Sequence, residues 1–209
     1  INRIDLGEIM MTNVYFVRHA QPEHDHMDDR TRPLTAEGIA DTKIVLETLK
    51  DKGIDAFYCS PYERSLATIR ETAEYYRMDI QSDERFRERE KGVNGNSHGM
   101  FQKRWADLDY HEEGGESIGM VQRRNIEALK EILAANDGKN IVIGTHGKAL
   151  SSIMNYYIPE FGCDDFLRII DWMPYIVEMD FEGQDFVALS ELAHIEKEFK
   201  GKARADKKS

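Results

Sequence analysis

The sequence predicts an α/β fold, a three-layer α/β/α sandwich built around a mostly parallel central sheet. Short apolar runs of β-prone residues occur at 14–17, 54–59 and 141–144, as expected for strands of a buried sheet. Between them, apolar residues recur at helical spacing. A strand, helix, strand order of this kind predicts parallel pairs joined by right-handed crossovers.

Composition limits the possible functions of the protein as well as its fold. The 209 residues suffice for one large domain or two small ones, and 41% hydrophobic with 32% charged residues is typical of a soluble globular protein. No apolar run approaches the roughly 18 residues of a membrane helix, so we expect no membrane partner. The net charge of -11 argues against nonspecific nucleic-acid binding and requires any anion site to concentrate arginines locally.

The chain divides into a short leader, one domain and a tail. Residues 1–12 carry charges without a continuous apolar core, which predicts a leader of low structural content rather than a signal peptide. Residues 13–193 contain no repeat and no linker. Residues 194–209 hold six Lys or Arg against three acids and are predicted to be a charged tail, a frayed helix or a disordered end. Cys59 and Cys163 fit neither a disulfide framework nor a zinc spacing, which predicts a cytoplasmic protein.

In the first half of the chain, each predicted strand is followed by charged or potentially catalytic residues. The strand at 14–17 runs into Arg18 and His19, and a polar loop follows. Thr35 is the expected N-cap of one helix that Gly53 ends. After the strand at 54–59, Ser60 is the expected N-cap of the next helix, with Pro61 at the first helical position and Glu63 completing a capping box. This arrangement puts Arg64 in the first turn, near the same edge of the sheet.

The second half repeats the pattern. A short strand at 78–82 precedes a charged run, a short helix at 100–108 and a long helix from 114–117 to 136–138. The strand at 141–144 ends in Thr145-His146-Gly147-Lys148, and a helix is expected over 149–157. Two or three strands are predicted across 167–189, with a hairpin at 182–184.

Three strands therefore end in cationic or imidazole groups, at the edge where open α/β sheets bind ligands. The residues are Arg18 with His19, Arg64 beyond the second strand, and His146. Arginine forks suit phosphate oxygens, and an imidazole among arginines is driven toward its neutral, nucleophilic form. Together they indicate phosphoryl transfer through a histidine nucleophile without a metal.

The ordered motifs resemble those of the histidine phosphatase superfamily, which includes cofactor-dependent phosphoglycerate mutases. The similarity covers roughly residues 13–190, and four motifs in order are far more specific than any one alone. The matching segments are Arg18-His19-Ala20 (RHA), 34–38 (LTxxG), 60–68 (SPxxRSxxT) and His146-Gly147 (HG), with Phe86-Arg87-Glu88 similar to an LRE segment and GGES at 114–117.

This resemblance implies a phosphoglycerate mutase-like fold and a phosphohistidine mechanism. His19 would attack phosphorus, and Glu88 would protonate the leaving alkoxide and then activate water. Glu90 and Glu116 compete with Glu88 for this role. Alternatively, the charged run that holds Glu88 is a solvated face, and Glu116 is a first-turn acid that complements a helix dipole.

The resemblance also implies a set of phosphate-binding residues: Arg18, Gln21, Arg64, His146 and Gly147. No metal and no other cofactor is expected. The His and Asp residues at 24–29 fit no regular ligand spacing and are interpreted as a solvated substrate-entry loop. Lys148 departs from the small or neutral residue usual after HG and is expected either to add charge at the pocket rim or to face solvent.

Three functions follow, in order of preference. The first is hydrolysis of a small phosphate monoester, favoured because the chain is shorter than typical mutases and lacks an extra arginine-rich insertion. A cofactor-dependent phosphoglycerate mutase is the alternative, and a noncatalytic phospho-ligand-binding protein is the third. The sequence specifies neither the identity of the ester nor the oligomeric state.

Overall fold

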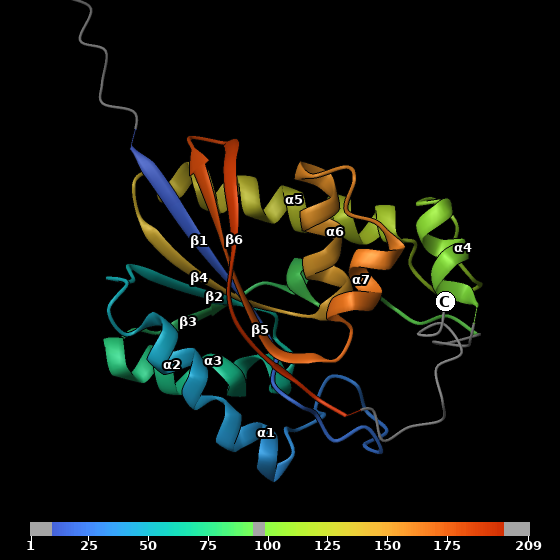
Figure 1. Cartoon of the computed structure of the whole chain (residues 1–209), viewed down its shortest axis with the longest axis horizontal. Helices are drawn as coiled ribbons and strands as arrows, with labels where there is room; N and C mark the ends of the chain where they lie inside the picture. The colour runs from blue at the N-terminus through green and yellow to red at the C-terminus, as the bar shows by residue number, and fades with distance from the viewer. Residues whose placement is uncertain (1–9, 94–98, 199–209) are drawn as a thin grey trace, which may run out of the picture.

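The computed structural model describes residues 10–93 and 99–198, and its centre is a six-stranded sheet (Figure 1). The strand order is β3-β2-β4-β1-β5-β6. The strands are β1 (Met11–Arg18), β2 (Ala56–Cys59), β3 (Ile80–Ser82), β4 (Asn140–Thr145), β5 (Trp172–Glu182) and β6 (Asp185–Glu196). The first four are parallel, whereas β5 and β6 are antiparallel to their neighbours. The predicted mostly parallel sheet is confirmed.

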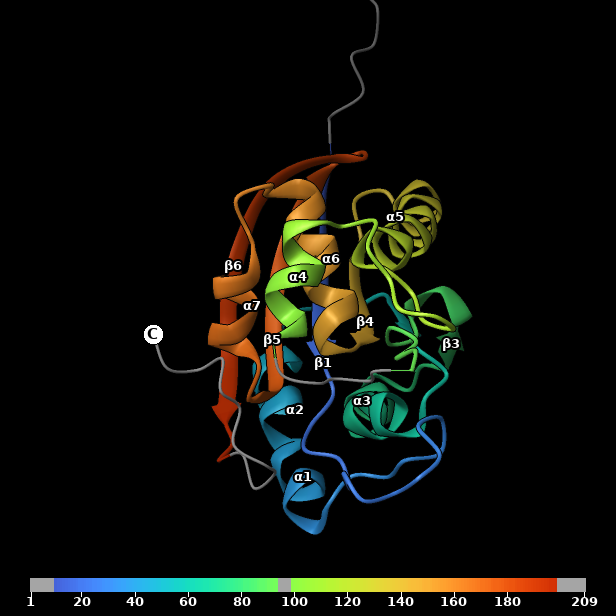
Figure 2. The same ribbon diagram turned by 90° about the vertical axis from the view of Figure 1, so that its right-hand side faces the viewer.

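Helices cover both faces of the sheet (Figures 1 and 2). They are α1 (Ala36–Asp41), α2 (Lys43–Leu49), α3 (Glu63–Tyr76), the 3-10 turn η1 (Glu84–Phe86), α4 (Met100–Ala106), α5 (Ile118–Ala135), α6 (Gly147–Tyr157) and α7 (Cys163–Ile169). One core layer joins the sheet to α5, α6 and α7, and a second joins it to α2 and α3. The predicted three-layer sandwich is confirmed.

Alternation along β1 assigns its side chains to these two layers. Val14 and Phe16 lie in the α5–α7 layer, and Tyr15 and Val17 lie in the α2–α3 layer. All four are buried because successive residues of a strand point to opposite faces and both faces are covered. A central strand of this kind holds its last residue, Arg18, and the following His19 in a fixed place.

Several predicted boundaries were wrong. The single helix expected from Thr35 is two helices, broken at the buried Thr42, whose hydroxyl donates to the Ile39 carbonyl. Thr35 does cap α1, since its side chain accepts from the Gly38 N–H. The residues before β5 form α7 rather than a strand that starts at Leu167, because a short apolar run does not distinguish a buried helix from a strand.

The predicted domain limits also shift. β1 begins at Met11, inside the predicted leader, and β6 runs to Glu196, inside the predicted charged tail. Lys197 is buried, donates its N–H to the Asp171 carbonyl, and forms ion pairs through Nζ with Glu37 and Asp41. Residues 194–197 are therefore part of the fold rather than of a tail. Residues 1–9 and 199–209 lie outside the described residues.

No helix among the described residues has the length and apolar character needed to cross a bilayer.

Candidate active site

The ends of β1, β2 and β4 meet at one edge of the sheet. Arg18 is paired with Thr145, and Cys59 is paired with Gly144. The backbone continues this pairing beyond the strands: the His19 N–H donates to the Thr145 carbonyl at 3.1 Å. The three chain segments expected to converge are therefore neighbours, and β4 lies between the other two.

His19 is held in a single tautomer. It is 6% exposed, and its Nδ1 lies 2.8 Å from the Ala20 carbonyl, which can only accept a hydrogen bond. Nδ1 therefore carries the proton, and Nε2, which has no hydrogen-bond partner among the described residues, keeps its lone pair. Burial, together with Arg64, His146 and Arg18, holds the pKa of His19 well below its usual range. A neutral imidazole with one open nitrogen is the form that a nucleophile requires.

His146 faces His19 edge-on, with ring centroids 5.3 Å apart and planes inclined by 60°. It is fully buried, and its Nε2 lies 2.7 Å from the Ser60 hydroxyl. Nδ1 is also buried and has no hydrogen-bond partner in the described part of the chain. Burial, Arg64 and further cations keep the pKa of His146 well below its usual range.

The hydroxyl groups of the 60–68 segment fasten α3 to the ends of the other strands. Besides the Ser60 contact with His146, Ser65 Oγ donates to the Thr145 carbonyl at 3.2 Å. The Ala20 N–H donates to Thr68 Oγ1 at 2.9 Å. The expected capping box was wrong: α3 begins at Glu63 with Tyr62 as N-cap, because Ser60 Oγ is engaged by His146 and by the Tyr62 N–H.

Arg64 and Arg18 are both buried but are held differently. Arg64 donates through one terminal nitrogen to the Asp29 carbonyl at 2.5 Å and lies 3.4 Å from the Asp29 carboxylate. Arg18 donates through its two terminal nitrogens to the carbonyls of Ile169 and Ile170, each at 2.8 Å. Its guanidinium carbon would lie 3.1 Å from a side chain at position 147, so Gly147 lets Arg18 pack over the start of α6.

Glu88 lies beside this cluster and accepts two backbone N–H bonds. Arg89 N–H donates to Oε1 at 2.9 Å, and Lys148 N–H donates to Oε2 at 3.3 Å. Burial alone raises the pKa of Glu88, but the Lys148 ammonium, the Arg89 N–H and the Arg64 guanidinium outweigh burial and lower the pKa to about 2. The Glu88 carboxyl is therefore ionised in the unliganded site.

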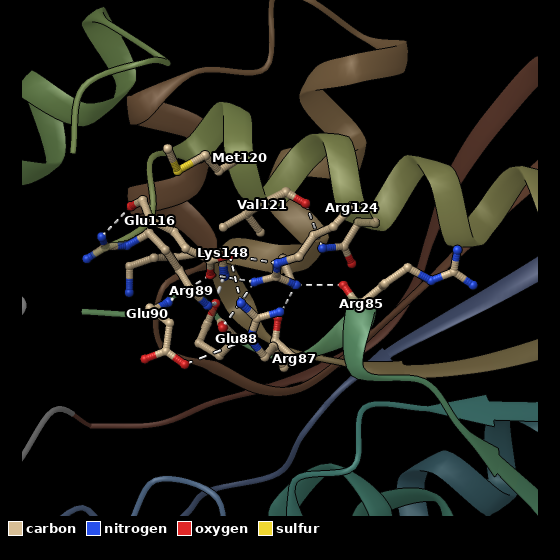
Figure 3. A network of polar contacts seen from close by, with 12 residues as sticks. Arg85, Arg87, Glu88, Arg89, Glu90, Glu116, Met120, Val121, Arg124 and Lys148 are labelled. Carbon is tan, nitrogen blue, oxygen red and sulfur yellow. Dashed lines mark hydrogen bonds and ion pairs between the residues drawn. The ribbon is translucent and has the colours of Figure 1, made fainter. Parts of the chain in front are cut away.

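The two competing glutamates have other partners. Glu116 accepts from the Arg124 guanidinium at 3.0 and 2.8 Å, from Arg87 and from the Glu90 N–H. Arg124 also donates to the carbonyls of residues 85, 87 and 88, and Figure 3 shows it reaching from α5 to this backbone. The Glu90 side chain is exposed and pairs only loosely with Arg87, at 3.8 Å. Glu116 thus holds the segment that carries Glu88.

Gln21 is directed to a different neighbourhood. Its Oε1 accepts from the Thr35 hydroxyl at 3.0 Å, and it lines a cavity of about 640 Å³ beside α1. A Cβ at Gly38 would lie 2.3 Å from the Gln21 carbonyl, so the LTxxG segment closes tightly on this residue. The Gln21 side chain is therefore held by its contact with Thr35. A role for Gln21 in binding phosphate stays a prediction.

The polar loop at 24–29 is tied to itself and to Arg64. Asp28 accepts from the Arg30 N–H and the Thr31 hydroxyl, and Asp29 pairs with Arg32 at 2.7 Å. Within residues 10–93 and 99–198, no three His, Cys, Asp or Glu side chains are grouped as a metal site.

Sequence reasoning missed four side chains around the site. Ser60 was assigned to a helix cap, Thr68 and Arg124 were given no role, and Lys148 was placed at the rim or in solvent. Lys148 is half-buried, with its ammonium 5.9 Å from the ring centroids of both Phe101 and Phe166. Ser60 and Thr68 were signalled by the matched 60–68 segment, and Lys148 by its departure from the residue type usual after HG, whereas Arg124 had no such signal.

Comparisons with known proteins identify relatives by sequence and by fold. Two curated relatives, both named probable phosphoglycerate mutase GpmB, are 28% identical in Proteus mirabilis and 29% identical in an Enterobacter species. Each alignment covers 69% of this chain and 74% of the relative.

Solved structures share the fold at low identity. A mycobacterial glucosyl-3-phosphoglycerate phosphatase superposes with a TM-score of 0.71 at 16% identity, over 87% of this chain and 97% of that one. A mutant phosphoserine phosphatase from Entamoeba histolytica, in complex with phosphoserine, superposes with a TM-score of 0.73 at 19% identity, over the same shares of the two chains.

The sequence profile of the histidine phosphatase superfamily (branch 1) matches residues 14–190, which include every motif described above. The chain belongs to the histidine phosphatase superfamily.

Proposed function

We propose that the protein hydrolyses a small phosphate monoester through a phosphohistidine intermediate on His19, without a metal. One observation carries the proposal: the Nδ1 proton of His19 is engaged by the Ala20 carbonyl, which leaves the Nε2 lone pair open at the edge where β1, β2 and β4 meet. Attack by Nε2 forms the N–P bond as the ester P–O bond breaks. Water then displaces the histidine and releases phosphate.

The surrounding cations suit the charge of a phosphoryl group in transit. Arg64 and Arg18 are buried close enough to His19 to depress its pKa, and the unpartnered Nδ1 of His146 is a potential donor to a phosphoryl oxygen. Arg64 now binds Asp29 and would exchange this contact for the phosphate. Gly147 contributes by admitting the Arg18 guanidinium, and Gln21 is proposed as a further donor.

Glu88 is the proposed general acid and base. Its pKa of about 2 is that of the unliganded site, and a phosphate dianion bound between Glu88 and the arginines would raise it. The carboxyl would then donate its proton to the leaving alkoxide and take one from the incoming water. Its position supports this assignment, because Glu116 is committed to Arg124 and Glu90 is exposed.

A phosphoglycerate mutase is the second candidate, favoured by the names of the curated relatives. The two reactions share the phosphohistidine and differ in what receives the phosphoryl group, water or a second hydroxyl. A cytoplasmic setting is part of the proposal. It is supported by Cys59 and Cys163, which are not joined in a disulfide, as is typical of proteins from reducing compartments.

The test is phosphate release from p-nitrophenyl phosphate, and separately from 3-phosphoglycerate with bisphosphoglycerate, in the presence of a chelator. Hydrolysis that His19→Ala abolishes, with an acid-labile phosphoenzyme trapped on denaturation, supports the phosphatase. Interconversion of phosphoglycerates without net phosphate release would replace it with the mutase. Binding of phosphate esters without turnover across a broad panel would leave a phospho-ligand-binding protein.

A further inference from the structure

Lys148 is a strongly polar side chain beside Glu88 that the proposed mechanism does not use. It sits in the first turn of α6, directly after His146 and Gly147, and Figure 3 shows it together with Glu88 and Arg89. Its ammonium has no hydrogen-bond or ion-pair partner among residues 10–93 and 99–198. The nearest groups recorded are the faces of Phe101 and Phe166, each 5.9 Å from Nζ.

A half-buried ammonium without a hydrogen-bond acceptor is costly, because desolvation is not offset by bonds to its three N–H groups. The aromatic faces compensate in part through cation–π attraction but accept no hydrogen bond. Burial lowers the pKa of Lys148 to about 8, against the opposing influence of the Glu88 carboxylate. The three donors therefore remain available to an oxygen ligand that enters the site.

Cations predominate among the groups that act most strongly on Lys148. They are one carboxylate, Glu88, and three cations: Arg89, Arg104 and Lys91. Arg89 and Arg104 are buried, and both form ion pairs with Glu112. In a chain whose net charge is -11, such a local excess of cations favours an anionic ligand.

We infer that Lys148 binds a second anionic group, a carboxylate or a phosphate, on the alcohol portion of the substrate. This inference rests on the proposed function, in which Glu88 meets the ester oxygen. The Lys148 backbone N–H donates to the Glu88 carboxylate, so the Lys148 side chain begins beside the end of the Glu88 side chain. The second anion must therefore lie only a few bonds from the ester oxygen, which selects small, compact phosphate esters.

Lys148 could instead serve only to hold Glu88, and the two roles differ in what they do to selectivity. A partner of Glu88 affects turnover of every ester alike. A ligand for the second anion affects only esters that carry one, and it acts mainly through KM. The discriminating quantity is therefore the ratio of kcat/KM between two esters that differ only in the second anion.

The experiment uses phosphoserine against phosphoethanolamine, and 3-phosphoglycerate against glycerol 3-phosphate. We expect the wild type to prefer the carboxylate-bearing member of each pair. We expect Lys148→Met to lower this preference about 10- to 100-fold, the effect of losing a hydrogen bond to a charged group, mainly through KM. Lys148→Arg should keep most of the preference, because it keeps the charge. Lys103→Met, which removes an exposed lysine stacked on Tyr110, is the matched control and should change nothing.

Equal losses for both members of each pair, or no preference in the wild type, would overturn the inference. Measuring the affinity for two phosphonates tests the second-anion site independently of whether the protein hydrolyses any ester. 2-Amino-4-phosphonobutyrate carries a carboxylate that 3-aminopropylphosphonate lacks, and neither can be hydrolysed. Tighter binding of the first compound that Lys148→Met removes supports the second-anion site even if no ester is turned over. Equal affinity of the wild type for both phosphonates rejects it.

Discussion

His146 Nε2 lies 2.7 Å from the hydroxyl of Ser60, and the opposite ring nitrogen has no partner within the described residues. The two residues are 86 positions apart in the chain, and they meet because β2 and β4 are adjacent. A hydrogen bond of this kind sets the orientation of the imidazole, and with it the direction in which Nδ1 points. Ser60 is thus a positioning residue for His146.

Removing the Ser60 hydroxyl should therefore reduce turnover while leaving the fold intact. We expect Ser60→Ala to lower kcat/KM about 10- to 100-fold, since the hydrogen bond that orients the buried His146 ring is lost and Nε2 is left without a partner. Steady-state kinetics with p-nitrophenyl phosphate measures the effect. Ser152→Ala removes another buried hydroxyl, bonded to the Ala149 carbonyl, and should leave activity unchanged. Similar rates for the two variants would contradict the role given to Ser60.

The leaving group should decide how much Glu88 matters. An alkoxide needs a proton to depart, whereas p-nitrophenolate departs without one. Because kcat/KM reports the phosphorylation of His19 and not the later attack of water, we expect Glu88→Gln to lower kcat/KM about 10²- to 10³-fold for an alkyl phosphate and less than about tenfold for p-nitrophenyl phosphate. Glu90→Gln, on an exposed side chain, should affect neither substrate. If the alkyl-specific loss followed Glu90 instead, the acid would be misassigned.

Stability should depend on the partly buried Arg124–Glu116 pair. Arg124→Met leaves the Glu116 carboxylate short of its main partner and frees three backbone carbonyls, so we expect a loss of about 3 kcal/mol in the free energy of unfolding. Arg123 is its neighbour on α5, with a side chain 65% exposed, and Arg123→Met should change stability by less than about 0.5 kcal/mol. Urea denaturation of both variants at constant m-value measures the difference.

The ionised Glu88 carboxylate should also make stability depend on pH. Its pKa is about 2 in the folded protein and 4.5 in an unperturbed chain, so the unfolded state takes up the proton first as the pH falls. The stabilisation is fully present above about pH 5 and is lost progressively toward pH 2.

Glu88→Gln cannot titrate, so its stability should fall less steeply with acid. Between pH 7 and pH 3 we expect the difference in free energy of unfolding between wild type and Glu88→Gln to shift by about 2 kcal/mol in favour of the variant. Chemical denaturation at a series of pH values measures it. A difference that stays constant with pH would show that Glu88 has the same pKa in both states.

Hydrophobic patterns in the sequence predicted many of the helices and strands, because these patterns depend on residues that are close together in the chain. Apolar runs such as 14–17 and 141–144 have to be buried strands, and the α5 face follows from helical spacing. The prediction from local sequence failed where one side chain had two competing hydrogen-bond partners. Ser60 has the sequence context of a helix cap, yet its hydroxyl bonds to His146, and a residue 86 positions away leaves no trace in a local pattern.

The sequence by itself determined the family-specific chemistry of this protein: a histidine and an arginine at the end of a buried strand, a second arginine in a helix turn, and a histidine after a later strand. Strand order and side-chain contacts were decided only in three dimensions. These include the Nδ1 contact that frees His19 Nε2, the network that commits Glu116 to Arg124, and the burial of Lys148 against two rings. The reason is physical: residue types specify which groups are available, but distances, desolvation and neighbouring charges specify which proton or ligand each group holds.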